Sequence, residues 1–156
     1  MDSMVSIYLQ RAEDEFLLAE KDMELSLSQE IKEILGIQKE KTFFNSVISH
    51  AYYCIFYTAK AYLLSKKIKT MPPEEHKKTY MEFQKAVLTG KIDKQLIQIY
   101  ETETIKAEAL LRILFTEKRK RGIFTYNVKS EANIPYAKES ISNAKAFAAT
   151  IKAIIK

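Results

Sequence analysis

Residues 42–66 read TFFNSVISHAYYCIFYTAKAYLLSK, and the apolar residues in this stretch recur at steps of three and four. That spacing is the period of an α-helix. The apolar side chains also cover more than half of the helix circumference, which leaves little of its surface for water. We therefore expect a helix over about residues 42–66 at the centre of the protein, with other helices packed around it.

Four other segments have the same periodicity. They span about residues 3–35, 73–89 and 92–120, and a last one opened by Asn133-Ile134-Pro135. Pro72-Pro73 separates the second helix from the third, and Gly36, Gly90 and Gly122 are the expected stop signals. No internal repeat or low-complexity segment interrupts the pattern. The sequence predicts one all-α helical bundle, a single domain over residues 1–156.

The composition agrees with a globular helical domain. Three glycines and three prolines in 156 residues are too few for the many turns of an all-β protein, and 47% hydrophobic residues can build a core. A helix needs about 20 apolar residues to span a bilayer, and no apolar run in the chain approaches that length. Met1-Asp2 opens no signal peptide. The one cysteine, Cys54, excludes an intramolecular disulfide and a multi-cysteine zinc site. We expect a soluble protein of the reducing cytoplasm.

The net charge of +5 is unevenly distributed. Residues 1–40 hold 4 basic and 10 acidic side chains, whereas residues 41–156 hold 21 basic and 10 acidic ones. The stretch 112–129 is the most basic, with six Lys and Arg residues against Glu117. Such a cluster can face phosphate groups, and it can equally be a solvated surface that keeps the protein soluble.

No motif of a known cofactor or metal site is present: the chain has no Gly-rich phosphate loop, no paired-histidine metal motif and no nucleophile elbow. We expect no cofactor and no metal. His50 lies beside the aromatic face of the central helix and is expected to be a packed or interface residue. His76, in an acidic first turn, is expected to face solvent or to cap a helix.

The central helix also carries a cysteine and several tyrosines. Cys54 is expected to be a small core residue and not a nucleophile. Tyrosine combines an apolar ring with a polar tip, which suits the edge of a core or a subunit interface. The tyrosines concerned are Tyr52, Tyr53, Tyr57 and Tyr62.

The segment 118–127, KRKRGIFTYN, follows a long predicted helix that breaks at Gly122. The Arg121 guanidinium can hold a phosphodiester with two parallel hydrogen bonds, and the glycine break lets Tyr126 turn back towards it. The alternative is an exposed basic helix end that complements the helix dipole. The candidate nucleotide- or RNA-binding residues are Lys118, Arg119, Lys120, Arg121 and Asn127, with Tyr126 beside them and His50 as an auxiliary.

The order of these segments resembles the HEPN superfamily, in particular its small, stand-alone prokaryotic and archaeal members. The resemblance covers about residues 8–155 and rests on an ordered set: Arg11-Ala12-Glu13, Ser49-His50-Ala51-Tyr52-Tyr53, Ala61-Tyr62-Leu63-Leu64, Glu75-His76-Lys77-Lys78, Thr89-Gly90-Lys91-Ile92-Asp93, Arg121-x4-Tyr126, Ala137-Lys138-Glu139 and Asn143-Ala144-Lys145-Ala146-Phe147. The segment of about 24–42 is longer than in the shortest members.

The resemblance implies an up-and-down bundle of four to five helices, usually a homodimer. Many HEPN proteins are metal-independent RNases with an Arg-x4–6-His motif, and many are toxins paired with a minimal nucleotidyltransferase antitoxin. Arg121 matches the arginine, but the positions for the histidine hold Tyr126, Asn127 and Val128. Tyrosine, with a reference pKa of about 10, is poorly suited to take the 2′-hydroxyl proton. The Arg121–Tyr126 pair instead resembles members in which the tyrosine accepts adenylate.

Three functions remain open from the sequence. The leading one is a protein that binds nucleotide or RNA phosphate and works with a nucleotidyltransferase partner, with Arg121 gripping phosphate and Tyr126 lining the same cleft. The second is an active RNase toxin, with catalysis by Arg121 and with Tyr126 or a histidine from elsewhere as the base. The third is a helical homodimer that serves as an adaptor. The homodimer itself is expected because tyrosine is enriched at interfaces.

Overall fold

The computed structural model describes residues 2–111 and 133–155. These residues form helices and no strands, which confirms the all-α prediction. The helices are α1 (Ser3–Leu27), α2 (Gln29–Leu35), α3 (Phe44–Ser65), α4 (Glu75–Leu88), α5 (Lys94–Leu111) and α6 (Ile134–Ile154). The six helices of the described part exceed the four to five expected, because the first predicted helix is divided in two.

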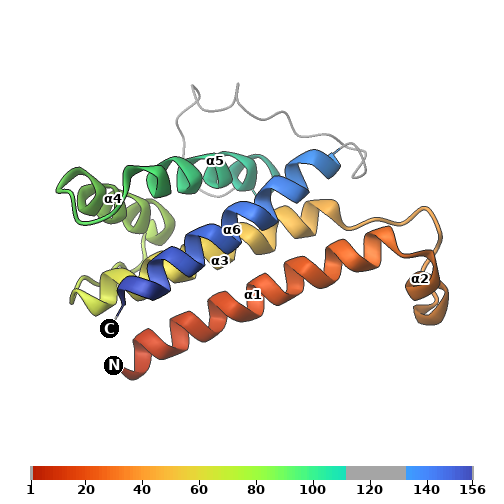
Figure 1. Ribbon diagram of the computed structural model, residues 1–156, viewed down its shortest axis with the longest axis horizontal. Helices are drawn as coiled ribbons and strands as arrows, with labels where there is room; N and C mark the ends of the chain where they lie inside the picture. The colour runs from red at the N-terminus through yellow and green to blue at the C-terminus, as the bar shows by residue number, and fades with distance from the viewer. Residues whose placement is uncertain (1, 112–132, 156) are drawn as a thin grey trace.

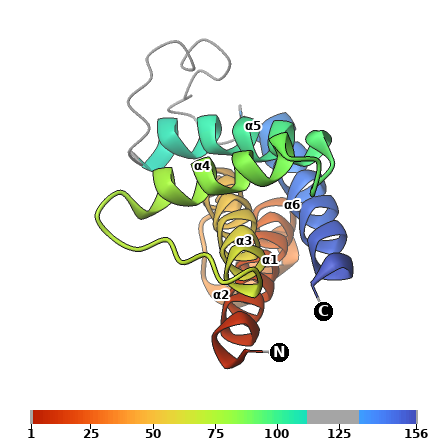
Figure 2. The same cartoon turned by 90° about the vertical axis from the view of Figure 1, so that its left-hand side faces the viewer.

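Helix α3 lies in the centre, as its apolar surface predicts. It contacts α1, α4, α5 and α6. Helices α1 and α5 run in one direction and α3 and α6 in the other, whereas α4 lies crosswise at one end and α2 forms a short hook at the opposite end (Figure 1, Figure 2). The arrangement leaves α3 with buried side chains around most of its circumference, among them Val47, Ile48, Cys54, Phe56 and Lys60.

The division of the first helix occurs at Ser28. Its backbone is extended (φ −103°, ψ 112°), and its N–H donates to the Glu24 carbonyl at 3.0 Å. The Ser28 Oγ accepts from the N–H of Ile31 at 3.2 Å, so one residue ends α1 and caps α2. Neither glycine nor proline marks this position, and the prediction of a continuous helix over 3–35 was therefore wrong. The stop at Gly36 is confirmed, because this residue has a left-handed φ of 70°.

The other boundaries lie close to those predicted. Helix α4 begins at Glu75 and not at residue 73, because Glu74 has a left-handed φ of 58° that cannot continue a helix. Helix α5 begins after Asp93, whose side chain accepts from the N–H of Gln95 at 2.9 Å. Helix α6 begins at Ile134 with Pro135 in its first turn, as expected. The predicted end of the fourth segment at residue 120 lies outside the described residues.

Candidate functional site

The basic segment predicted to bind phosphate lies outside the described residues. This applies to Lys118, Arg119, Lys120, Arg121, Tyr126 and Asn127. The described chain stops at the end of α5 and resumes at Asn133, whose Nδ2 donates to Asn45 Oδ1 at 2.5 Å. Asn45 lies in the first turn of α3. The fold thus brings together, at one end of the molecule, the end of α5 and the start of α6, which flank the segment, and the start of α3 beside them.

A cleft with a volume of about 300 Å³ lies at the opposite end of α3. The first turns of α1, the last turns of α3 and the chain after α3 form its walls. The lining residues are Asp2, Met4, Tyr8, Lys60, Leu64, Ile68, Lys69, Thr70 and Met71. The walls are mostly apolar and carry a few polar groups, which is the usual make-up of a small-molecule site.

Lys60 is the charged group enclosed by the cleft, with only 6% of its side chain exposed. Its Nζ donates to the Thr70 carbonyl at 3.1 Å and to Glu75 Oε2 at 2.8 Å. The same Nζ lies 4.9 Å from the centre of the Tyr8 ring, within the range of a cation–π contact. An ammonium group has three N–H donors, so two bonded oxygens leave one donor without an oxygen partner among the described residues.

Aromatic rings extend from the cleft along the face between α1 and α3. The rings of Tyr8 and Tyr57 are stacked with centres 6.2 Å apart, and Tyr53 stacks on Tyr57 at the same distance. The exposed Arg11 places its guanidinium carbon 4.6 Å from the centre of the Tyr57 ring. Flat rings next to a cation can stack nucleobases and bind a phosphate at the same time.

The chain that borders the cleft is basic. Residues 66–78 contain five lysines against Glu74 and Glu75, a balance of +3. Of these lysines, Lys69 lines the cleft, together with the acidic Asp2, and the enclosed Lys60 is paired with Glu75. The surplus of lysines in the chain beside the cleft favours an anionic ligand.

His50 lies further along the same α1–α3 face, in an acidic environment. Its Nδ1 is 2.6 Å from Glu15 Oε2, and its Nε2 is 3.6 Å from Asp22 Oδ2. Burial raises the pKa of the Asp22 carboxyl, and the charge interaction with His50 opposes that shift. His50 is half-buried between helices, which agrees with the packed histidine expected. Two carboxylates beside it make this end of the face a poor place for phosphate.

His76 differs from its prediction: it faces the aromatic core and not the solvent. Its ring stacks on Phe56 with centres 4.1 Å apart, and its Nδ1 lies 2.8 Å from the Tyr52 hydroxyl. Burial lowers its pKa. No local sequence signal could reveal this contact, because Tyr52 precedes His76 by 24 residues and lies on another helix.

The tyrosines of α3 divide into two groups. Tyr52 and Tyr62 are buried in the core, so the interface role expected of the tyrosines does not apply to these two, whereas Tyr53 and Tyr57 are half-buried. Cys54 is buried, which confirms the expected core residue, and burial raises the pKa of its thiol to about 12.

Two further observations concern the described residues alone. No three His, Cys, Asp or Glu side chains in residues 2–111 and 133–155 are placed to hold a metal ion together. Within the same ranges, no helix combines the length and the apolar character needed to cross a membrane.

No protein-family model matches the chain, and no curated protein is significantly similar to it.

Proposed function

We propose that this chain is a HEPN-type helical protein that binds a nucleotide or RNA through its phosphate groups, together with a minimal nucleotidyltransferase partner. The alternating directions of α1, α3, α5 and α6 support the up-and-down bundle that this proposal requires (Figure 1). The order of motifs from Arg11 to Phe147 supports the family. Its site among the described residues is the cleft at Lys60, and Arg121 is a separate candidate phosphate contact, because the helix ends that flank its segment lie at the opposite end of α3.

The enclosed ammonium of Lys60 is the observation that carries the proposal. The cleft around it has a volume of about 300 Å³. Small-molecule ligands occupy clefts of this size. The Tyr8 ring and the apolar side chains form a wall against which a base can pack, Lys60 offers one N–H to an oxygen, and the lysines of residues 66–78 attract the negative charge. A neutral apolar ligand would use the walls of the cleft but none of these cations.

The state of the histidines favours binding over RNA cleavage. The chain has only His50 and His76. His50 is held between Glu15 and Asp22, and His76 is stacked on Phe56. Neither lies in a basic, open pocket in which it would take the proton of a 2′-hydroxyl. Tyr126 then serves, in this proposal, as the adenylate acceptor for the partner enzyme.

Fluorescence anisotropy with labelled ATP and a labelled short oligoadenylate tests the proposed site. We expect Lys60→Met to weaken binding about tenfold or more, because the methionine keeps the side-chain volume and removes the charge. Arg121→Ala should also weaken binding, and Lys156→Ala is the control for bulk charge. If Lys60→Met binds the labelled ligands as tightly as the wild type does, the cleft at Lys60 is not the binding site. If Arg121→Ala and Lys156→Ala lose the same amount of affinity, Arg121 acts only through bulk charge and is not a specific phosphate contact.

Incubation of the protein with mixed cellular RNA and a chelator tests the absence of cleavage. We expect intact RNA, since general acid–base help typically contributes about 10²–10⁴-fold and no suited base is available. Cleavage that disappears in Arg121→Ala would establish an RNase instead. Mass spectrometry after exposure to a cognate nucleotidyltransferase should locate adenylate on Tyr126, with Tyr126→Phe as the unmodified control.

A further inference from the structure

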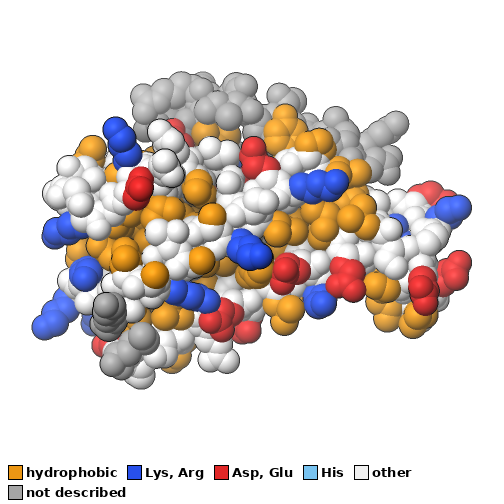
Figure 3. Space-filling model, in the orientation of Figure 1, with side chains coloured by type: hydrophobic (Ala, Val, Ile, Leu, Met, Phe, Trp, Pro, Cys, Tyr) orange, Lys and Arg blue, Asp and Glu red, His pale blue; other side chains and the backbone are white. Residues whose placement is uncertain are grey.

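A second groove, with a volume of about 300 Å³, runs between α1 and α6 on the face shown in Figure 3. Its apolar lining comes from Ala12 and Phe16 of α1, Ala148 and Ala149 of α6, and Cys54 of α3 beneath them. The half-buried Met23 and Ile141 pack on the neighbouring core cluster. The groove is therefore a strip of apolar surface bordered by two helices.

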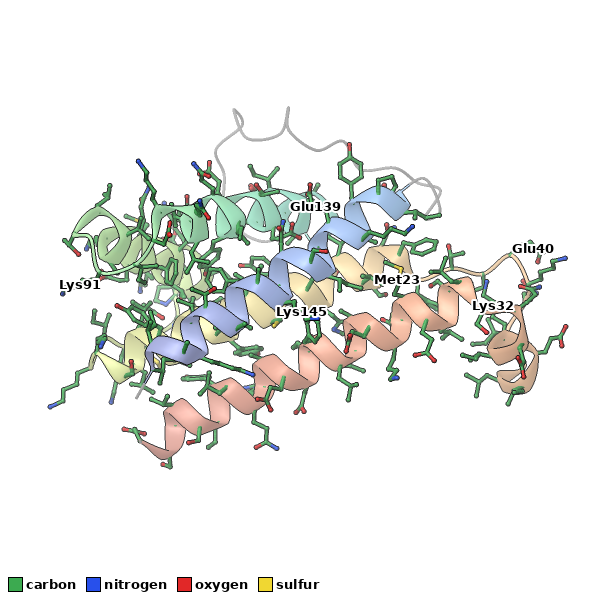
Figure 4. All side chains as sticks on the ribbon, viewed as in Figure 1. Met23, Lys32, Glu40, Lys91, Glu139 and Lys145 are labelled. Carbon is green, nitrogen blue, oxygen red and sulfur yellow. The ribbon has the colours of Figure 1, made fainter. Side chains whose placement is uncertain are left out.

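The two borders carry opposite charges. On α6, Lys138, Lys145 and Lys152 follow one another at intervals of seven residues, and on α1 Glu13 and Glu20 have the same interval. Seven residues are about two helical turns, so each set lies along one side of its helix. Blue side chains accordingly follow α6 and red ones follow α1 in Figure 3, and Lys145 lies over the gap between the helices in Figure 4.

Most of these charges are not used within the chain. Lys152 Nζ lies 2.7 Å from Glu13 Oε1, where the helices are joined across the groove. Among the described residues, Lys138, Lys145 and Glu20 make no ion pair, and all three are exposed. The groove thus has an apolar centre, a basic border and an acidic border, each with charge available to a partner.

We infer that a second copy of this chain covers the groove, related to the first by a two-fold axis that runs along the groove. Rotation about that axis places the basic α6 border of each copy opposite the acidic α1 border of the other. A two-fold axis across the groove would instead place lysines opposite lysines. The charges therefore select one symmetric arrangement, in which Glu20 of each copy is opposite Lys145 of the partner subunit.

Other occupants leave one border unsatisfied. A nucleic acid would meet the carboxylates of Glu13 and Glu20, and an acidic peptide would do the same. A basic peptide would be repelled by Lys138 and Lys145. Only a partner with both signs of charge in the reverse order, such as the groove itself, matches both borders.

Charge reversal tests the arrangement, with sedimentation equilibrium as the measurement. We expect a dimer that dissociates more readily at high salt. Lys145→Glu and Glu20→Lys should each weaken it about tenfold or more, because each change acts twice in a symmetric dimer. The double variant Glu20→Lys/Lys145→Glu should restore the dimer. The exposed Lys91, at the far end of the molecule from α2 in Figure 4, supplies the matched control Lys91→Glu.

Disulfide cross-linking tests the direction of the axis. On a Cys54→Ser background, Glu20→Cys protein is mixed with differently tagged Lys145→Cys protein and oxidised. We expect mixed cross-linked dimers carrying both tags and few cross-links between two identical chains. A protein that stays monomeric at about 100 µM would overturn the inference. A dimer whose affinity changes no more in Lys145→Glu than in Lys91→Glu, or one that cross-links mainly between identical chains, would overturn it as well.

Discussion

Lys60 and Lys106 are both lysines that the fold removes from water, yet their surroundings differ. Lys106 has 3% of its side chain exposed and lies between α5 and α6, with Glu103, Glu139 and Ser140 within hydrogen-bonding distance of its Nζ. Lys60 has 6% exposed and lies in a cleft, with one carboxylate partner, Glu75, that is itself 27% exposed. A lysine surrounded by its own counter-charges holds two helices together, whereas a lysine with one solvated partner and an open side keeps a donor for a ligand.

The largest effect is expected from Lys106→Met. This change leaves Glu103, which is fully buried, without its cation. Breaking one half of a buried pair costs about 3–5 kcal/mol of unfolding free energy. Urea denaturation followed by circular dichroism measures the loss. Lys106→Met/Glu103→Gln should recover part of it, because no uncompensated charge then remains. A double variant as unstable as the single one would contradict the ion-pair explanation.

Phe56→Ala should cost nearly as much, towards the lower end of about 3–5 kcal/mol. The Phe56 ring is 2% exposed, stacks on His76 and lies 5.7 Å from Lys60 Nζ. The change tests whether apolar packing, and not charge, stabilises the region around Lys60. The measurement is again urea denaturation, with the exposed Leu88→Ala as the control. Phe56→Ala no more destabilised than Leu88→Ala would refute a packed core at this point.

Lys60→Met should change stability by about 1 kcal/mol or less, since Glu75 remains partly solvated and a methionine fits the apolar walls. The same variant is expected to lose ligand binding, so stability and binding separate at this lysine. Lys106→Met, in contrast, should lower the free energy of unfolding strongly, because Lys106 is a structural lysine. A loss of stability as large as that of Lys106→Met would show that Lys60 is also a structural lysine.

The smallest effect concerns pH. Burial lowers the pKa of His76. The unfolded chain therefore binds more protons than the folded one below the ordinary histidine value of about 6.5. The neutral His76 ring therefore contributes its full stabilisation above about pH 6.5. This contribution is lost as the pH falls from about 6.5 to the lower pKa that His76 has in the folded protein. Between pH 7 and pH 5, the free energy of unfolding should change less with pH in His76→Gln than in the wild type. His50→Gln is the companion variant, and equal slopes for wild type and His76→Gln would contradict the prediction.

The apolar periodicity made the helices predictable from the sequence. The features that could not be predicted, the break at Ser28 and the contacts of Lys60 and Lys106, have physical causes. Residues 42–66 and 134–155 show their apolar faces and end signals in the sequence, so α3 and α6 lie where expected. The break at Ser28 depends on a serine hydroxyl that can act inside a helix or as a cap, and the sequence does not distinguish these roles. Apart from Glu103, which lies three residues before Lys106, the partners of Lys60 and Lys106 are 10 to 34 residues away, Thr70 and Ser140 among them, and no local pattern reveals these contacts.

The hook formed by α2 and the chain after it begins and ends at one place. Ser26 Oγ accepts from the N–H of Phe43 at 2.7 Å and donates to the Asp22 carbonyl, which joins the exit of α1 to the entry of α3. Inside the hook, Lys32 Nζ bonds to the Lys39 carbonyl at 2.9 Å, near Glu40 in Figure 4. The Ser26 hydrogen bonds therefore join α1 to α3 without help from residues 27–42. This connecting segment can be shortened, lengthened or replaced by another domain, because the length of a loop adds little to the free energy of bringing its ends together.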